Sequence, residues 1–394
     1  MAHQLLLDRS VANVIKLFNW NVKLWAIVLA LIVVLAGTGF ALSDRTNADD
    51  TSIVLARANT EGSGIFGDEP GMAVLEDGYM VLVKEKWGGK VIATPGPTSI
   101  QYMIIKEQLL SVGLTVKAFD NVNPPGTNEV QLKDVGVGLM AAEFTAGTID
   151  GGIAWEPIYS DILDNAPGAY DVCMTNQLEG QLGHACCMVV ANSNFLNDNS
   201  EATVRFLAAY CDAVDFINNA KFLGPGSDEY KELMKSCKVL LNGYDNEVIE
   251  EALANVTYTY NLTNFEDEYV DLIHAYQESG VIPRNAMDSI GLTPEQFAKS
   301  HIDGTYLNNA KSISKVEYKP VTIRVAYLGA DIHQLALQVA KDLGYFADYG
   351  IEIENVGPFA AGGAVLDAIL TGEADIGFAG APPTVMKTVN LAAS

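Results

Sequence analysis

An alternation of strand and helix signals occurs twice in the chain, and this repeat restricts the fold more than any other feature. In the later copy, Val321–Tyr327 (VTIRVAY) alternates like a strand, and Ile351–Ile353 and Asp375–Ala379 are further strand segments. Amphipathic helical runs separate these strands, and Asp331 lies where a helix N-cap is expected. Such β-α-β-α-β units predict an α/β fold.

The earlier copy has the same organisation. Its strand signals are Lys90–Ala93, Gly113–Lys117 and Asp150–Ala154. A helix is expected to begin near Ile100, and a helical stretch is expected between Gly126 and Gly147.

Matched residues relate the two copies. Gly147-Thr-Ile-Asp150 corresponds to Gly372-Glu-Ala-Asp375, and Pro157 and Pro382 each follow the aspartate by seven residues. Two similar lobes are therefore expected. The carboxyl ends of their strands and the N-termini of their helices should face a cleft between them.

A cleft of this kind binds a polar or anionic ligand through helix N-termini and hydrogen-bond donors. The candidate ligand-binding residues are Asp331, His333, Gln334, Gly362, Gly363, Gly380 and Ala381 in one lobe, and Thr98, Ser99, Gln101, Trp155 and Glu156 in the other. The alternatives are that Thr98 and Ser99 serve only as N-caps and that His333 is an exposed first-turn histidine. Trp155 is favoured as a wall of the cleft. These loops contain no Lys or Arg, so the charge of the ligand stays open.

His184, Cys186 and Cys187 form the one cluster that suggests a metal site. In a strand, residues 184 and 186 share a face while 187 points away, so only two ligands would converge. Two ligands are too few for structural zinc, and core packing is favoured. GxSxG, HExxH and P-loop patterns do not occur in the sequence. No metal, cofactor or catalytic residue is therefore expected.

The N-terminal part of the sequence contains an uncharged segment of 19 residues, Leu24–Leu42, which is about the length needed to span a bilayer. Arg9, Lys16 and Lys23 precede it, which predicts a cytoplasmic tip and an exported body. Residues 1–50 are therefore expected to be a membrane anchor or a signal peptide. The formal net charge of -25 argues against nucleic acid as a partner.

Five segments together resemble one family of transport proteins. They are VAYLGADIHQLALQVAKDLGYFADYGIEIE, AAGGAVLDAILTGEADIGFAGAPP, GGKVIATPGPTSIQYMI, GTIDGGIAWEPI and GHACCMVVANSNFL. The resemblance is to the extracytoplasmic solute-binding proteins of ABC importers, in the nitrate, sulfonate, taurine, bicarbonate and thiamine-precursor branch. It implies a two-lobed type II periplasmic-binding-protein fold. It also implies a non-enzymatic protein that captures a small polar or anionic molecule and delivers it to the transmembrane subunits of an ABC permease.

Other functions remain open on the sequence alone. One alternative is a binding protein for a pyrimidine or thiamine precursor, and another is an enzyme of the related synthase type that uses the His184, Cys186 and Cys187 cluster. A ligand-sensing domain of a signalling system is a third alternative, although no signalling domain is attached.

The order of the segments differs from that of the family, because the part resembling Val321–Ser394 comes first there. A circular permutation is therefore expected, with a truncated tandem array or an assembly error as alternatives. The permutation would place Ser394 near Thr51. The expected parts are lobe I (51–86, 188–310 and 321–394), lobe II (87–187) and a linker (311–320), with crossings between lobes near Lys86–Lys90 and near Gly183–Met188.

Overall fold

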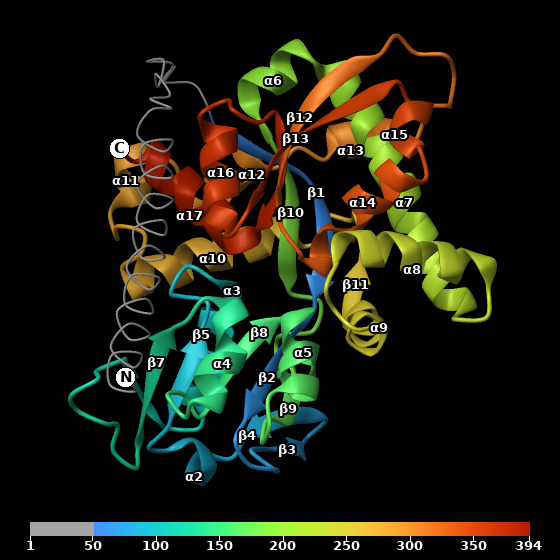
Figure 1. Ribbon diagram of the computed structural model, residues 1–394. Helices are drawn as coiled ribbons and strands as arrows, with labels where there is room; N and C mark the ends of the chain where they lie inside the picture. The colour runs from blue at the N-terminus through green and yellow to red at the C-terminus, as the bar shows by residue number, and fades with distance from the viewer. Residues whose placement is uncertain (1–50) are drawn as a thin grey trace, which may run out of the picture. The chain divides into compact units, whose positions relative to one another are not determined.

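The computed structural model describes residues 51–394, and the expected anchor or signal segment over 1–50 lies outside the described residues. Two sheets of six strands each organise this part of the chain (Figure 1). We call the sheets, together with the helices packed on them, lobe I and lobe II. None of the helices between Thr51 and Ser394 combines the length and the apolar character needed to cross a membrane.

Lobe I is built on a mixed sheet. In spatial order its strands are β11 (Val256–Tyr258), β1 (Ser52–Glu61), β10 (Ala185–Asn192), β14 (Ile376–Gly380), β12 (Val321–Leu328) and β13 (Ile351–Phe359). Side chains of β10 alternate between two cores, with Val189 and Ala191 in one and Met188 and Val190 in the other. Burial on both faces explains why the sequence of β10 is almost continuously apolar.

Helices cover both faces of this sheet. One core includes residues of α6 (Ser193–Asp198), α7 (Ser200–Leu223), α8 (Asp228–Leu240), α9 (Asn246–Asn255), α13 (Thr305–Ala310), α14 (Leu335–Asp342) and α15 (Tyr345–Asp348). The other core includes residues of α10 (Phe265–Ser279), α11 (Ala286–Ile290), α12 (Pro294–His301), α16 (Gly362–Leu370) and α17 (Ala381–Ala392). A short 3-10 helix, η3 (Ile332–Gln334), follows β12.

Lobe II has a smaller sheet. In spatial order its strands are β6 (Thr115–Ala118), β7 (Glu129–Asp134), β5 (Val91–Thr94), β8 (Gly151–Trp155), β2 (Ser63–Gly67) and β9 (Tyr170–Met174). The other elements of this lobe are the hairpin β3 (Ala73–Glu76) and β4 (Tyr79–Leu82), the helices α2 (Lys84–Trp87), α3 (Ile100–Ser111), α4 (Met140–Thr145) and α5 (Ile158–Asn165), and the 3-10 helices η1 (Val137–Leu139) and η2 (Thr175–Gln177).

The two sheets share one arrangement, which confirms the internal repeat. β5 lies between the parallel strands β7 and β8, as β12 lies between the parallel strands β13 and β14. β8 and β14 then pair antiparallel with β2 and β10. Oδ2 of Asp150 accepts a hydrogen bond from the backbone N–H of Val91 at 2.7 Å. Oδ2 of Asp375 accepts the same bond from Arg324 at 2.8 Å.

The helical stretch expected between Gly126 and Gly147 is wrong in its first half. Strand β7 occupies part of it, and the α-helix α4 covers only Met140–Thr145. Val130, Gln131 and Leu132 are buried between β5 and β6. β7 is therefore the counterpart of β13, because it pairs directly with the first strand of its unit.

The crossing expected near Lys86–Lys90 is also wrong. The chain leaves β1 of lobe I at Glu61 and Gly62, with φ of 65° and 85°, and enters β2 of lobe II directly. Residues 63–86 therefore belong with lobe II, where Trp87 packs in the same core as β2. The return crossing lies between the end of β9 at Met174 and the start of β10 at Ala185.

The carboxylate of Glu61 ties the two crossings together. Its Oε1 accepts a hydrogen bond from the backbone N–H of Gly183 at 2.9 Å, and its Oε2 accepts one from Nδ2 of Asn176 at 3.1 Å. Thr257 of β11 donates a further bond to Oε2 at 3.2 Å. The connections between the lobes therefore act as one hydrogen-bonded unit.

Segments from both ends of the described chain meet in lobe I. The buried hydroxyls of Ser52 and Thr388 are hydrogen-bonded at 2.5 Å, which places the start of β1 beside α17. Strands β12, β13 and β14 are integral to the sheet of lobe I, so Val321–Ser394 is not an independent half-domain. Residues 313–320, within the expected linker, contain neither helix nor strand.

Candidate functional site

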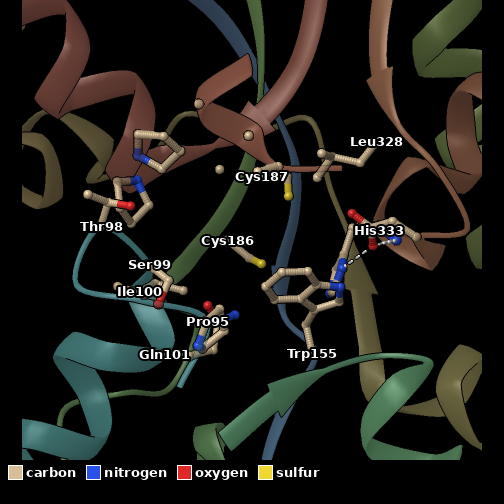
Figure 2. Close-up of a pocket in the computed structure, with 17 residues that line it drawn as sticks. Pro95, Thr98, Ser99, Ile100, Gln101, Trp155, Cys186, Cys187, Leu328 and His333 are labelled. Atoms are coloured by element: carbon tan, nitrogen blue, oxygen red, sulfur yellow. Dashed lines mark hydrogen bonds and ion pairs between the residues drawn. The ribbon is translucent and has the colours of Figure 1, made fainter. Parts of the chain in front are cut away.

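A pocket lies between the lobes at the ends of their central strands. Its cavity volume is about 120 Å³, and it is lined by residues of both lobes (Figure 2). A cavity of this size suits a small ligand.

Most of the residues predicted from the sequence meet in this pocket. Nine of the twelve line it, namely Thr98, Ser99, Gln101, Trp155, Asp331, His333, Gly362, Gly363 and Gly380. The structure thus brings together residues that come from two distant parts of the chain.

Gln334, Ala381 and Glu156 do not line the pocket. Gln334 is buried and donates a hydrogen bond to Oδ2 of Asp331 at 3.2 Å, so it supports a lining residue from behind. Ala381 is fully buried as the first residue of α17. The carboxylate of Glu156 accepts hydrogen bonds from Ser160 and from Asn255. Burial raises the pKa of Glu156, although these bonds oppose the rise.

Several lining residues were not predicted. They are Pro95, Ile100, Cys186, Cys187, Leu328, Ala361, Pro382 and Pro383. Most are apolar neighbours of predicted residues at strand exits and helix starts, and their position was the only signal that could have identified them. The two cysteines were assigned to the core because, together with His184, they would bring only two metal ligands together.

Three helix N-termini reach the pocket, and those of α3 and α16 can supply backbone donors to it, because the lining residues Pro382 and Pro383 of α17 have no backbone N–H. Helices α3, α16 and α17 contain 12, 9 and 12 residues, and the first turn of each contributes to the lining. Ser99 is also an N-cap, because its hydroxyl accepts a hydrogen bond from the backbone N–H of Tyr102 at 3.1 Å. Unpaired N–H groups and the helix dipole favour a negatively charged or electron-rich group here.

Gly362 allows two of these helices to approach each other. A Cβ atom at this position would lie 3.1 Å from Cγ of Pro383 and 3.4 Å from the backbone nitrogen of Gly380. A larger residue would push α16 away from α17 and widen this wall of the pocket.

His333 is buried, with only 2% of its surface exposed, so the alternative of an exposed first-turn histidine is wrong. Its Nδ1 lies 2.6 Å from Oδ1 of Asp331, which also accepts the backbone N–H of His333 at 3.0 Å. Burial alone would lower the pKa of the imidazole. The negative charges of Cys186 and Asp331 outweigh burial and hold this pKa well above its ordinary value.

Cys186 and Cys187 both line the pocket, whereas His184 lines a separate groove beside α3 and α10. Nε2 of His184 lies 3.1 Å from the hydroxyl of Thr175. The histidine at the lining thiols is therefore His333, which comes from a distant segment. Within residues 51–394, no group of three or more His, Cys, Asp or Glu side chains is arranged to hold a metal ion.

The electrostatic character of the pocket comes mainly from backbone groups. Among the described residues that line it, none is Lys or Arg, and Asp331 and His333 are its carboxylate and its imidazole. In Figure 2 the half-buried indole of Trp155, at the end of β8, is drawn between Cys186 and His333. The site thus combines an aromatic wall with donors from helix N-termini.

Comparison with protein-family models gives two matches. A model described as the NMT1-like family matches residues 21–223, and one described as NMT1/THI5 like matches residues 333–390. A search of curated proteins finds no match.

Solved structures with a similar arrangement include import proteins. The periplasmic nitrate-binding protein NrtA from Synechocystis PCC 6803 is 15% identical, with 66% of this chain and 67% of that chain covered and a TM-score of 0.49. The periplasmic sulfonate-binding protein SsuA from Methylobacillus flagellatus KT is 17% identical, with coverage of 66% and 69% and a TM-score of 0.41. The ligand-binding component of an ABC-type import system from Staphylococcus aureus is 12% identical, with coverage of 61% and 71% and a TM-score of 0.40.

Proposed function

The chain belongs to the NMT1-like family, and on that premise we propose that it is the extracytoplasmic solute-binding component of an ABC import system. One observation carries the proposal: the N-termini of α3, α16 and α17 converge with Trp155 on a single pocket between two lobes. Such a pocket can hold a small molecule and release it when the lobes separate. This role requires no chemical reaction of the ligand.

The proposed ligand is a small polar or anionic molecule of the sulfonate, nitrate or bicarbonate class. Helix N-termini bind anions through backbone N–H groups and the helix dipole, without a cationic side chain. The ligand-binding residues are proposed to be the nine predicted residues that line the pocket. Gln334, Ala381 and Glu156 are proposed to support them from behind.

A screen of ligands on the full chain tests this function. Nitrate, bicarbonate, taurine, an alkanesulfonate and a pyrimidine would each be titrated while the melting temperature is recorded, because a ligand that binds the native state stabilises it. A rise with one of the anions supports the proposal. A rise with the pyrimidine alone would favour the alternative of a pyrimidine or thiamine-precursor binding protein, and no rise with any compound would contradict both.

The remaining parts of the proposal concern location and partners. We propose that the lobes lie outside the cytoplasm. We also propose that they deliver the ligand to the transmembrane subunits of an ABC permease. Attachment to the membrane through residues 1–50 is part of the same proposal. Protease added to intact cells should then cleave the chain beyond residue 50, and complete protection would contradict this location.

The order of the segments relative to the family is proposed to be a circular permutation. The hydrogen bond between Ser52 and Thr388 supports it, because a permuted chain brings these two segments together.

A further inference from the structure

Two copies of a modification motif lie close together in lobe I. The motif is Asn-X-Ser/Thr, with X other than proline, and on an exported protein its asparagine can carry an N-linked glycan. The copies are Asn255-Val-Thr257 and Asn261-Leu-Thr263. Because the motif is short, the structural surroundings of each asparagine decide whether it can be used.

Asn261 lies in the exposed loop between β11 and α10. Its Oδ1 accepts a hydrogen bond from the backbone N–H of Thr263 at 2.8 Å and another from the hydroxyl of Thr263 at 2.7 Å. The two outer residues of the motif thus close an Asx turn on themselves. This turn fixes the side-chain amide and leaves its nitrogen, Nδ2, exposed and without a hydrogen bond to any of residues 51–394.

The rest of this loop is anchored to lobe I. The backbone N–H of Asn261 donates to the hydroxyl of Thr259 at 3.1 Å. The carbonyl of Thr263 accepts a hydrogen bond of 3.0 Å from the guanidinium of Arg57, which is buried. Leu262 packs against the core that contains residues of α10. A well-supported turn therefore presents the amide of Asn261 to the solvent.

Asn255 is placed differently. It is the last residue of α9, and its Nδ2 already donates a hydrogen bond of 2.7 Å to the buried carboxylate of Glu156. Thr257, the third residue of this copy, lies in β11 and donates its hydroxyl to Oε2 of Glu61 at 3.2 Å. A sugar on Asn255 would have to fit into the contact between the lobes. The folded structure therefore disfavours this asparagine as an acceptor.

We propose that Asn261 is the acceptor of an N-linked glycan and that Asn255 is not modified in the folded protein. In this step Nδ2 of Asn261 forms a bond to the anomeric carbon of a lipid-linked oligosaccharide. The bond from that carbon to the pyrophosphate of the lipid breaks, the pyrophosphate keeps the bonding electrons, and Nδ2 releases one proton to the solvent. A membrane oligosaccharyltransferase catalyses the transfer. The proposal rests on the proposed function, because it requires the lobes to lie outside the cytoplasm.

The first test uses the full chain isolated from its own cells. The protein would be digested, and the peptides that contain Asn255 and Asn261 would be separated and analysed by mass spectrometry before and after enzymatic removal of N-glycans. A glycan on the peptide that contains Asn261 supports the proposal. An unmodified Asn261, or a glycan on Asn255 alone, would overturn it.

The second test separates the effect of the fold from that of the motif. The folded full chain, produced without glycans, would be incubated with a purified oligosaccharyltransferase and its lipid-linked oligosaccharide. Asn261 should be modified at least about tenfold faster than Asn255, whose use requires local opening of the contact between the lobes. Synthetic peptides that span each motif should be modified at similar rates. Equal rates at the two asparagines of the folded chain would contradict the structural argument.

Variants assign the glycan to this motif. Asn261→Gln and Thr263→Val should each abolish the glycan, whereas Thr263→Ser keeps the hydroxyl and should retain it. Asn255→Gln is the matched control and should carry the same glycan as the wild type. A glycan that persists in Asn261→Gln would show that another residue is the acceptor.

The proposed function can fail separately from this proposal. External protease reports the location of the lobes, so an accessible chain with an unmodified Asn261 would overturn the acceptor alone. A cytoplasmic chain would overturn both. Binding of nitrate or a sulfonate by Asn261→Gln, measured by calorimetry, tests the transport function without the glycan.

Discussion

Nδ2 of Asn255 donates a hydrogen bond of 2.7 Å to Oε1 of Glu156, and this bond joins α9 of lobe I to the exit of β8 in lobe II. Glu156 is fully buried, and its other hydrogen-bond partners are the backbone N–H and the hydroxyl of Ser160. One of the hydrogen bonds between the lobes therefore involves a carboxylate whose ionised form is penalised by burial.

The first prediction concerns this carboxylate and pH. Because burial raises the pKa of Glu156 above that of an unfolded glutamate, near 4.3, the native state binds a proton more readily than the unfolded state. The contribution of Glu156 is thus fully present below the unfolded pKa and is lost as pH rises through the folded pKa. Urea unfolding across this range should show stability falling more steeply in the wild type than in Glu156→Gln. Parallel pH profiles would contradict the assignment.

The second prediction concerns the wall of the pocket. Trp155→Ala should weaken binding of the anion identified by the screen by roughly 1–3 kcal/mol, in line with the loss of an aromatic contact in a binding site. Trp155→Phe keeps a ring and should lose less. Calorimetry measures the affinities. Binding by Trp155→Ala that equals the wild type would place the ligand elsewhere.

Ligand should also change the fluorescence of Trp155. Trp87 is a suitable reference, because it is fully buried in the core of lobe II and its indole N–H donates to the carbonyl of Met72 at 2.8 Å. A signal that persists in Trp155→Phe would show that the response arises at another tryptophan.

The third prediction compares the two aspartates of the repeat. Asp150 accepts one backbone bond from Val91, whereas Asp375 accepts bonds from the backbone and from the guanidinium of Arg324. Asp375→Asn should therefore destabilise the protein by about 1–3 kcal/mol, and Asp150→Asn by less. The side chain of Arg324 is 41% exposed, so solvent screening limits the contribution of its ion pair to the free energy of unfolding. Chemical denaturation measures the free energy of unfolding of both variants. An equal or larger loss in Asp150→Asn would be inconsistent with this account.

The fourth prediction separates steric contact from backbone strain at the crossing. Gly62 and Gly89 have φ of 85° and 90°, but only Gly62 has neighbours that a Cβ atom would strike, namely His333 and Val256. An alanine at either position should destabilise the fold by about 1–3 kcal/mol through strain. Gly62→Ala should lose more stability and also displace the imidazole. Similar losses in the two variants would show that His333 and Val256 adjust without penalty.

Local features of the sequence were sufficient to predict much of the fold. The start of α3 at Ile100, the N-cap at Asp331 and the repeated aspartates depend on side chains close in sequence, and all were identified. Strand β7 was missed because the whole stretch between Gly126 and Gly147 was expected to be helical, although Val130 and Leu132 alternate with Gln131 and Lys133 as in a strand. Glu61 at the first crossing adopts a positive φ, for which a glutamate gives no sequence signal.

The pocket could be predicted only in part for a similar reason. The repeat identified strand exits and helix starts, so it found nine of the lining residues. The proximity of His333 to Cys186 depends on how β10 and the segment after β12 meet in three dimensions. No spacing in the sequence indicates this proximity. The cysteines were therefore interpreted as core residues, and His184 was interpreted as the histidine beside them.

The sheet of lobe I has a consequence for how the chain is made. All strands of lobe II lie between Ser63 and Met174, so that core can close early during synthesis. β10 then has β1 as a partner on one side, but its other neighbour, β14, is nearly the last segment to be translated. Until it arrives, the nascent chain exposes a long apolar edge of the kind that pairs with other chains. A holding chaperone or rapid export of the unfolded chain would protect this edge during that interval.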